Sequence, residues 1–325
     1  MTVLISGGTG FVGLNLAEAL LARGEAVVLF ALDTPPPRAL QRFAALPGTL
    51  AVEQGDVRGP GFADCLRRHA VDRLFPFAAV TSGPDRERDA PEQVLGVNLL
   101  GLVSQLRAAR DAGVRRVVAP SSAAVYGESF HGPGPMREDT TPPVPTGIYG
   151  VSKYAAERAA LRLGGLWGLD VVAARIGAVF GPWERDTGLR DTLSPFWRIA
   201  EAARAGQAVV LPAAIPAYSW LYSRDAAAAL LHLLDMPSPG QRVFNICSGI
   251  PAPEALPLWC RTLEGVHPGF AWRQSADPAG WTIPPTDPRP RAAMDTNRLR
   301  GTGWTPGFAA GAAMADYAAW VRAGA

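Results

Sequence analysis

The sequence predicts an α/β fold built on a doubly wound parallel sheet with helices on both faces. A glycine-rich turn stands between an apolar run at residues 2–5 and a helical pattern at residues 14–21. Five more apolar runs of strand length (25–32, 50–57, 74–80, 116–120 and 169–175) are separated by helical segments. Strands joined by helices favour right-handed parallel crossovers. The length of 325 residues suits one large domain or two ordinary ones.

The turn between the first strand and the first helix has the pattern Gly7-x-x-Gly10-x-x-Gly13. Free backbone N–H groups and the helix dipole favour an anion there. We expect the first glycine to make the tight turn, the second to let phosphates approach, and the third to pack the helix on the strand. Phe11 and Val12 complete the predicted cofactor-binding turn. The alternative is a tight turn that binds nothing.

Two carboxylates end the next two strands. Asp33 follows the second strand, 20 residues after Gly13, where it can accept the ribose hydroxyls of a dinucleotide and repel a 2′-phosphate. This favours NAD over NADP, although Arg38 lies nearby and Asp33 could instead cap the proline-rich turn that follows. Asp56, followed by Val57, could bond the adenine amino group or serve as a turn residue.

The middle of the chain combines two further strands with loops. The strand at 74–80 contains Pro76, which is awkward in a central strand, and Ala78 and Ala79, which let the backbone pass close to a cofactor. Residues 82–91 are predicted to form a mobile loop, and residues 94–112 an amphipathic helix that includes Asn98. Residues 128–147 are rich in proline and glycine, which predicts a loop over a cleft.

Tyr149 and Lys153 open the next helix and, four residues apart, lie on the same face. After residue 180 the pattern loosens to helices at 195–205, 223–234 and 308–321 and strands at 209–211 and 243–247. We therefore predict a dinucleotide-binding domain at residues 1–180, joined by about 215–250. The remainder of 181–325 is predicted to form a smaller, interleaved substrate-binding domain over the cofactor cleft.

Composition excludes several classes of function. The net charge is +2, 18% of residues are charged and the basic residues are dispersed, which argues against nucleic-acid binding. Three isolated cysteines and four histidines without ligand spacing predict neither disulfides nor a metal site. The first residues lack a charged leader region, and apolar runs are too short for a membrane span. We therefore expect a cytoplasmic protein.

With Asn98, Ser122 before Ala-Ala-Val-Tyr-Gly, and Tyr149-x-x-x-Lys153 in this order, the chain resembles the extended short-chain dehydrogenase/reductases. These are NAD-dependent sugar epimerases, dehydratases and related dehydrogenases. The resemblance reaches the closing Gly-Trp-Thr-Pro at 303–306. It implies a Rossmann-type sheet, NAD as cofactor, and a homodimer through the helices that contain Asn98 and Tyr149.

The resemblance also implies roles at the site. Tyr149 is the acid/base for the hydroxyl whose carbon loses hydride, with its phenol acidified by Lys153 and by NAD⁺, since an ordinary tyrosine pKa is near 10. Lys153 also holds the nicotinamide ribose, and Ser122 bonds the reacting oxygen. Asn98 supports the site or relays protons; the alternative is a polar group that ties its helix to a neighbour.

Departures from the family pattern bear on the substrate. Alanines at 123 and 124 replace the acidic pair of the dehydratases, which disfavours dehydration. Ala178 and Tyr218 replace the Asn and Arg that grip a diphosphate, which favours a substrate without one. An arginine elsewhere could supply the missing charge; the candidates are Arg185, Arg190, Arg224, Arg289 and Arg291.

The leading hypothesis is an NAD-dependent oxidoreductase that takes hydride from a secondary alcohol of a sugar or sugar-acid-like substrate. A faint likeness to sugar-acid dehydrogenases at residues 79–83 and 220–223 supports it. The alternative is a sugar 4-epimerase, and a third hypothesis is an inactive NAD-sensing or scaffold protein. Ala178 is also counted with the cofactor residues. The predicted substrate-binding residues are Thr81, Ser122, Ala123, Tyr149, Arg185 and Tyr218.

Overall fold

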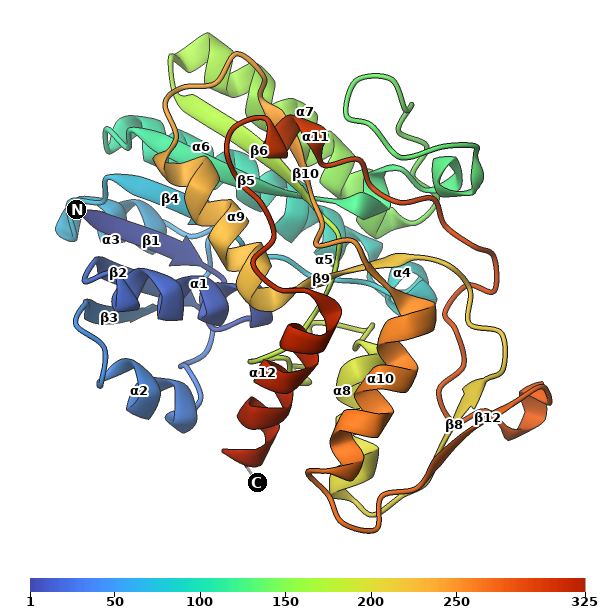
Figure 1. The fold of residues 1–325 in the computed structure, drawn as a ribbon. Coiled ribbons are helices and arrows are strands. Elements are labelled where there is room, and N and C mark those ends of the chain that lie inside the picture. Colours follow the sequence, from blue (N-terminus) through green and yellow to red (C-terminus); the bar gives the residue numbers. More distant parts are fainter. Residues whose placement is uncertain (325) are drawn as a thin grey trace.

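A computed structural model of the protein describes residues 1–324, and in this range seven strands form one parallel sheet in the order β10-β6-β5-β4-β1-β2-β3 (Figure 1). The predicted doubly wound sheet is confirmed. Its strands are β1 (Thr2–Ser6), β2 (Ala26–Ala31), β3 (Thr49–Gln54), β4 (Arg73–Pro76), β5 (Arg116–Ser122), β6 (Asp170–Ile176) and β10 (Val243–Ile246).

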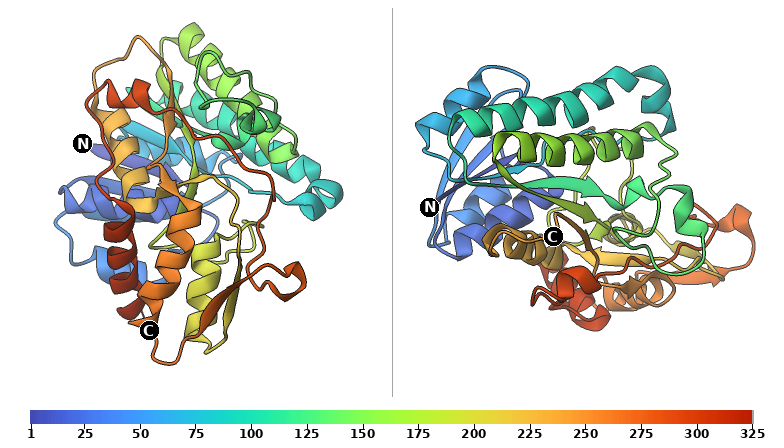
Figure 2. Two further views of the ribbon diagram at one scale, coloured as in Figure 1. Left: turned by 45° about the vertical axis from the view of Figure 1, so that its right-hand side comes forward. Right: turned by 90° about the horizontal axis from the view of Figure 1, so that it is seen from above.

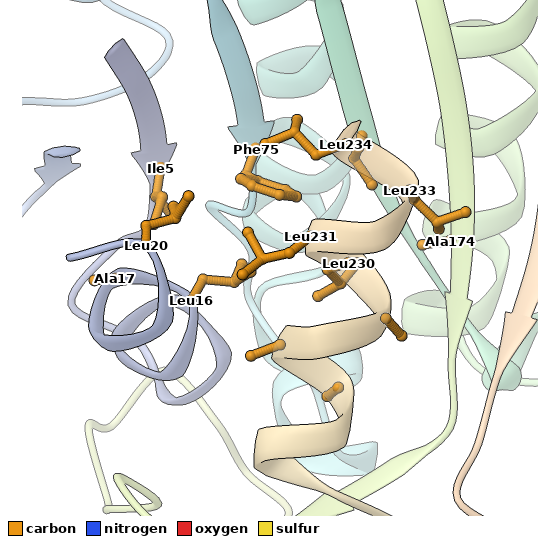
Figure 3. Close-up of a cluster of buried hydrophobic side chains, with 14 of the residues drawn as sticks. Ile5, Leu16, Ala17, Leu20, Phe75, Ala174, Leu230, Leu231, Leu233 and Leu234 are labelled. Atoms are coloured by element: carbon orange, nitrogen blue, oxygen red, sulfur yellow. The ribbon is translucent and has the colours of Figure 1, made fainter. Parts of the chain in front are cut away.

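Helices cover both faces of this sheet because alternate residues of a strand point to opposite faces (Figure 2). Val3 and Ile5 pack in one hydrophobic cluster, and Leu4, between them, packs in another. The first cluster includes side chains of α1 (Phe11–Ala22), α2 (Pro37–Phe43) and α9 (Ser223–Asp235), as Figure 3 shows for α1 and α9. The second includes α3 (Gly61–Arg68), α6 (Leu102–Asp111) and α7 (Ile148–Trp167).

The fourth strand is shorter than predicted and ends at Pro76. Proline has no N–H for the ladder, and the next residue, Phe77, donates its N–H to Ser6 O at 3.1 Å. The chain then passes against the glycine turn. A Cβ on Gly7 would lie 2.7 Å from the Cα of Ala78. Ending the strand early therefore brings the two predicted cofactor-binding segments together.

The prediction of a mobile loop at 82–91 is wrong. Residues Pro84–Asp89 form α4 and Pro91–Leu95 form α5, each with proline at its first position and at least one acidic residue in its first turn. Both features favour a helix N-terminus. The helix predicted at 94–112 is part of a longer continuous helical run, in which the π-helical segment Gly96–Gly101 joins α5 to α6.

A smaller part of the molecule, here called the small lobe, comprises α8 (Pro195–Arg204), α10 (Ala252–Glu264), α12 (Ala310–Arg322) and the parallel pair β8 (Val209–Pro212) and β12 (Trp272–Ser275). It packs around its own aromatic cluster, in which Trp259 stacks on Tyr317 with ring centroids 4.6 Å apart. In Figure 1 it lies below the parallel sheet. It contains the helices predicted at 195–205 and 308–321.

The remaining elements are short. A second sheet joins β11 (Ile250–Pro251), β9 (Ser219–Tyr222) and β7 (Ala178–Phe180). The other helical segments are Ala123–Val125, Glu128–His131, Pro278–Gly280 and α11 (Asn297–Arg300). Within residues 1–324, the helices are too short or too polar to cross a membrane.

Candidate active site

A cavity of about 690 Å³ opens at the carboxyl ends of the parallel strands and continues to the small lobe. This edge of a doubly wound sheet is where such folds bind ligands. The cavity brings together all the predicted cofactor and substrate residues, and every predicted catalytic residue except Asn98. Its lining includes Gly7, Gly10, Phe11, Val12, Gly13, Asp33, Asp56, Val57, Ala78, Ala79, Thr81, Ser122, Ala123, Tyr149, Lys153, Ala178, Arg185 and Tyr218.

The glycine turn has the geometry of a diphosphate site. Gly7 has a φ of +61°, and a Cβ on Gly13 would lie 2.8 Å from Gly7 O, so neither position accepts a side chain without strain. Among the described residues, α1 has no side-chain cap at Gly10 and no acid in its first turn. Its first N–H groups and dipole therefore remain available to an anion, which fits the diphosphate of NAD.

Asp33 stands at the end of β2 with its carboxylate held in place. Thr9 Oγ1 donates to it at 2.6 Å, and a guanidinium nitrogen of Arg185 lies 3.6 Å away. Arg38, the residue that weakened the choice of NAD, instead covers the Trp320 ring, with its guanidinium carbon 3.8 Å from the ring centroid. Thus Asp33 keeps the position expected for ribose recognition.

Two arginines that the sequence did not assign to the cofactor, Arg58 and Arg185, contact predicted cofactor-binding segments. Arg58 forms a bidentate ion pair with Asp56, with Nε 3.0 Å from Oδ1 and Nη2 2.6 Å from Oδ2. The hydrogen bonds from Arg58 lower the pKa of the Asp56 carboxyl. Arg185, expected to bind substrate, donates to Thr9 O at 3.0 Å. It therefore lies beside the predicted cofactor residues.

The proposed catalytic side chains meet between β5 and α7. Tyr149 lies in the first turn of α7, where its N–H donates to Glu87 Oε1 at 3.1 Å. One turn later, the Lys153 ammonium lies 5.8 Å from the centroid of the Tyr149 ring and 3.4 Å from Pro120 O. Ser122 ends β5, and its Oγ accepts from Ala124 N at 3.1 Å. The spacing in the sequence therefore does bring these groups together.

Burial works against the charged forms of both proposed catalytic groups, Tyr149 and Lys153. It raises the pKa of Tyr149, while hydrogen bonding to Ser122, the nearby charge of Arg190 and a hydrogen bond to Thr81 pull that pKa down. Burial also lowers the pKa of Lys153 to about 8. The chain alone thus leaves the Tyr149 pKa raised, contrary to the lowering that the chemistry requires. The positive nicotinamide ring of NAD⁺ is a charge that would lower it.

Asn98 acts as a brace. Its side-chain oxygen accepts from Val80 N at 2.8 Å, and its amide donates to Val80 O at 2.9 Å and to Ser152 Oγ at 3.0 Å. Ser152 Oγ in turn donates to Tyr149 O at 2.7 Å. The residue is buried and does not line the described cavity. This arrangement matches the alternative reading, a polar group that ties its helix to neighbouring segments.

The substrate end keeps positive charge despite the loss of the two family residues. Arg291 and Arg190 line the cavity, and the charge of Arg291 opposes the burial that raises the pKa of Tyr218. By contrast, Arg224 pairs with Asp316 at 2.6 Å, and Arg289 pairs with Glu128 at 3.0 Å. Arg224 and Arg289 also do not line the cavity. Of the candidates that do, Arg185 lies at the cofactor end, which leaves Arg190 and Arg291 at the substrate end.

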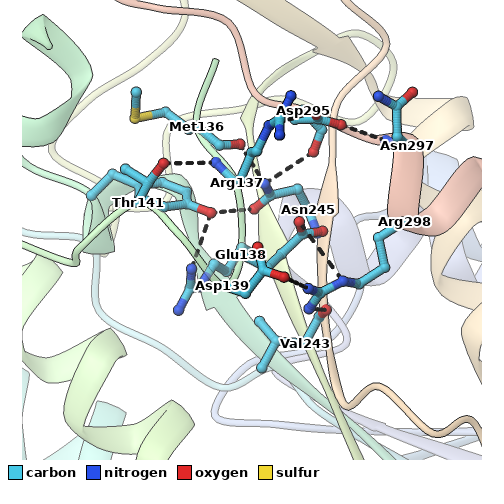
Figure 4. Close-up of polar contacts among 12 residues, drawn as sticks. Met136, Arg137, Glu138, Asp139, Thr141, Val243, Asn245, Asp295, Asn297 and Arg298 are labelled. Atoms are coloured by element: carbon cyan, nitrogen blue, oxygen red, sulfur yellow. Dashed lines mark hydrogen bonds and ion pairs between the residues drawn. The ribbon is translucent and has the colours of Figure 1, made fainter. Parts of the chain in front are cut away.

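The loop at 128–147 does border the cleft and is fastened to the C-terminal segment (Figure 4). Met136 forms an isolated β-bridge with Met294, a residue that lines the cavity. Half-buried Glu138 accepts from Asn245 N at 2.8 Å, and Arg298 lies 4.0 Å from its carboxylate. Phe130 of this loop lines the cavity. The loop is thus a fixed wall of the site.

Sequence reasoning missed the group that holds Arg190. Glu184 is buried, and its carboxylate accepts from Ser194 N at 2.8 Å and Ser194 Oγ at 2.5 Å, with Arg190 Nη2 at 3.2 Å. The Arg190 guanidinium lies 5.1 Å from the Phe11 ring centroid. Glu184, Arg190 and Ser194 belong to an irregular segment without hydrophobic periodicity, so their spacing did not indicate a functional role. The described residues show no cluster of three or more potential metal ligands.

Comparison with known proteins decides the family. Residues 3–247 match the family model described as "NAD dependent epimerase/dehydratase family". The chain belongs to this family. The matched region starts in β1 and ends just after β10, so it contains the glycine turn, Ser122, Tyr149 and Lys153. Membership confirms the resemblance and the choice of NAD.

Two named relatives illustrate the range of this epimerase/dehydratase family. Sterol demethylase protein B of Methylococcus capsulatus is 34% identical over 246 residues, which is 74% of this chain and 68% of that protein. UDP-glucose 4-epimerase of Lacticaseibacillus casei is 33% identical over 183 residues, or 56% of this chain. The match covers 52%, about half, of that epimerase.

Solved structures are similar over the full length. MoeE5 in complex with UDP-glucuronic acid and NAD has a TM-score of 0.78 and 26% identity, and each chain is covered completely. The Thermus thermophilus UDP-glucose 4-epimerase in complex with NAD has a TM-score of 0.79 and 26% identity, again with complete coverage of both. The small lobe is therefore part of an architecture shared with these family members.

Proposed function

We propose that the protein is an NAD-dependent sugar 4-epimerase whose substrate is carried on a nucleotide. The observation that carries this proposal is the continuity of the cavity. One space joins the glycine turn, the Ser122–Tyr149–Lys153 group, Arg291 and small-lobe residues such as Leu256 of α10. A dinucleotide and an extended substrate can therefore meet at Tyr149. The similarity to UDP-sugar 4-epimerases supports the same choice.

Tyr149, Ser122 and Lys153 have separate roles in the proposed reaction. NAD⁺, which the glycine turn and Asp33 would hold, would supply the hydride acceptor for the carbon that carries the reacting hydroxyl. Tyr149, as phenolate, takes the hydroxyl proton, while Ser122 bonds the same oxygen. Lys153, when protonated, stabilises the phenolate. For epimerisation Tyr149 would give the proton back to the same oxygen after the reduced cofactor had returned hydride to the opposite face of the sugar.

The test is turnover of UDP-glucose and UDP-glucuronic acid, with the 4-epimer detected by chromatography and NADH by absorbance. We expect the epimer to form with little free NADH. Tyr149→Phe should slow the reaction by about 10²–10⁴-fold, because it removes the proton acceptor, and should still bind NAD. Stoichiometric release of NADH would contradict the epimerase proposal, and full activity in Tyr149→Phe would show that this site is not used.

Net oxidation of a substrate without a diphosphate is the second candidate. Ala178 and Tyr218 favour it, because they replace the residues that grip the diphosphate. Apolar side chains at the small-lobe end of the cavity, including Ile215, Trp220 and Leu256, also favour it. Sterol demethylase protein B is named for sterol rather than nucleotide-sugar chemistry. NADH accumulating with sugar acids or with apolar secondary alcohols, and not with UDP-sugars, would select this candidate.

We also propose a cytoplasmic homodimer. The three cysteines are free and buried, which suits a reducing compartment. Apolar side chains stand exposed on the helical layer formed by the π-helical segment, α6 and α7: Leu100 is 65% exposed, Leu166 59% and Val151 41%. A second copy of the chain packed on this layer would bury them, in agreement with the dimer that the family resemblance implied.

A further inference from the structure

The segment of residues 184–193, here called the strap, crosses the cofactor half of the cavity. The two residues that precede the strap, Pro182 and Trp183, are bound to α1. Asn15 Nδ2 donates to Pro182 O at 2.8 Å, and the Trp183 indole donates to Glu18 Oε2 at 2.7 Å. Trp183 has a φ of +70°, a strained value for a residue other than glycine. The strap therefore leaves the helix of the glycine turn in a fixed direction.

Arg185, the second residue of the strap, reaches back to the glycine turn. One nitrogen donates to Thr9 O at 3.0 Å and also lies 3.6 Å from Asp33 Oδ2. Its Nε is buried and has no hydrogen-bond partner among the described residues. A positive group with an unused donor thus stands between the N-terminus of α1 and the carboxylate that is expected to bind ribose.

These features fit one ligand that must lie between the same two points. The diphosphate of NAD is expected at the N-terminus of α1, and its adenosine ribose at Asp33. A guanidinium pairs strongly with phosphate oxygens through its fork of N–H donors, and a buried donor without a partner is costly. We infer that Arg185 is a cofactor-binding residue that holds the adenosine side of the NAD diphosphate.

The far end of the strap is fastened beside the catalytic tyrosine. Thr81 N donates to Leu189 O at 3.0 Å, and Asp191 N donates to Thr81 O at 3.1 Å. The Asp191 carboxylate accepts from Gly83 N at 2.9 Å and from two nitrogens of Arg86. Between these anchors, Thr187 and Leu189 line the cavity. A segment that lines the cavity and is anchored at both ends would hinder the release of a cofactor bound there.

Retention of NAD has a use in the proposed reaction. An epimerase must keep the reduced cofactor between the two hydride transfers, and this benefit of the strap rests on the proposed function. The assignment of Arg185 rests only on NAD as the cofactor. The two are separable, because cofactor release can be measured without any substrate.

The experiment follows NADH leaving the enzyme. Protein loaded with NADH is mixed with excess NAD⁺, and the fall in bound NADH fluorescence gives the release rate. We expect Arg185→Met to release NADH about tenfold faster or more, equivalent to ~1.4 kcal/mol. Arg185→Lys, which keeps the charge without the fork, should fall between Arg185→Met and the unmodified protein. Arg261→Met, on the exposed side of α10 and outside the cavity lining, is the matched control and should not change the rate.

Asp191→Asn tests the other anchor and should also speed release, with thermal unfolding of each cofactor-free variant measured to confirm folding. Unchanged NADH release in folded Arg185→Met and Arg185→Lys, with a raised KM for substrate, would overturn the inference and assign Arg185 to the substrate. Faster release in a protein without epimerase activity would leave the inference standing and count against the proposed function alone.

Discussion

Lys153 shows how burial sets the chemistry of a single residue. Its ammonium lies 3.4 Å from Pro120 O, and burial lowers its pKa from 10.5 to about 8. The role assigned to Lys153 needs the protonated form. In the cofactor-free protein that form is lost as the pH rises through about 8, so the charge beside Tyr149 depends on pH near the physiological range.

The same pKa predicts a pH dependence of stability. The folded pKa is below the unfolded one, so the cost of burying a charged lysine is fully present below pH 8 and is relieved as the pH rises towards 10.5. We expect the free energy of unfolding of the cofactor-free protein to gain about 2 kcal/mol from Lys153 between pH 7.5 and 9.5. Urea unfolding of the natural protein and Lys153→Met at both pH values measures this gain.

Lys153→Met serves as the reference for the natural protein, because the two proteins share every other titrating group. The difference between the two proteins should change with pH in the direction given, with the natural protein gaining more. Parallel pH profiles would show that Lys153 is not buried in its charged form.

At this scale the sequence identifies the residues whose roles follow from spacing. Tyr149 and Lys153 lie one helical turn apart, and Asp33 follows a strand, so local structure alone places them. Arg185 and Arg190 belong to an irregular segment, and their partners Thr9 and Glu184 are set by how that segment crosses the cavity. Such contacts depend on tertiary packing, which spacing along the chain does not encode.

At the scale of elements, the π-helical segment Gly96–Gly101 gives Asn98 its position. π-helical turns are rare and occur often at functional sites. Here the turn presents Asn98 to both backbone groups of Val80, the residue before Thr81. The helical run therefore fixes the chain that carries Thr81, and through Ser152 it also contacts the backbone of Tyr149.

This bracing predicts a stability effect. Asn98→Ala would leave the buried N–H and C=O of Val80 without these partners, and we expect a loss of about 1–3 kcal/mol in unfolding free energy. Urea unfolding measures the loss. Gln207→Ala, which removes an exposed amide, should change stability by less than about 0.5 kcal/mol. Equal, small effects of both changes would rule out the bracing role.

Element boundaries show where the sequence pattern is insufficient. The alternation of strands and helices predicts the parallel sheet, because it reflects burial on both faces. The fourth strand ends at Pro76, four residues early, since the apolar residues after it line the cavity and the glycine turn instead of the sheet. α4 is charged at every position after Pro84 and has no buried residue, so hydrophobic periodicity could not reveal it.

At the scale of the whole molecule, the two exposed helical surfaces differ in character. The layer of the π-helical segment, α6 and α7 carries three large exposed apolar residues, Leu100, Leu166 and Val151. On the opposite face of the sheet, α2 carries one, Leu40. Single exposed apolar residues are ordinary, but several on one surface suggest an interface. The difference predicts which face a second copy covers.

Leu166→Glu should therefore convert a dimer to a monomer, because it places a charge in a surface that a second chain would bury. Light scattering after size-exclusion chromatography gives the mass. Leu40→Glu is the matched control: Leu40 is 41% exposed on α2, and its replacement should leave the dimer intact. A monomeric natural protein would contradict the dimer outright. A dimer broken by Leu40→Glu, and not by Leu166→Glu, would move the interface to the face of the sheet that α2 covers.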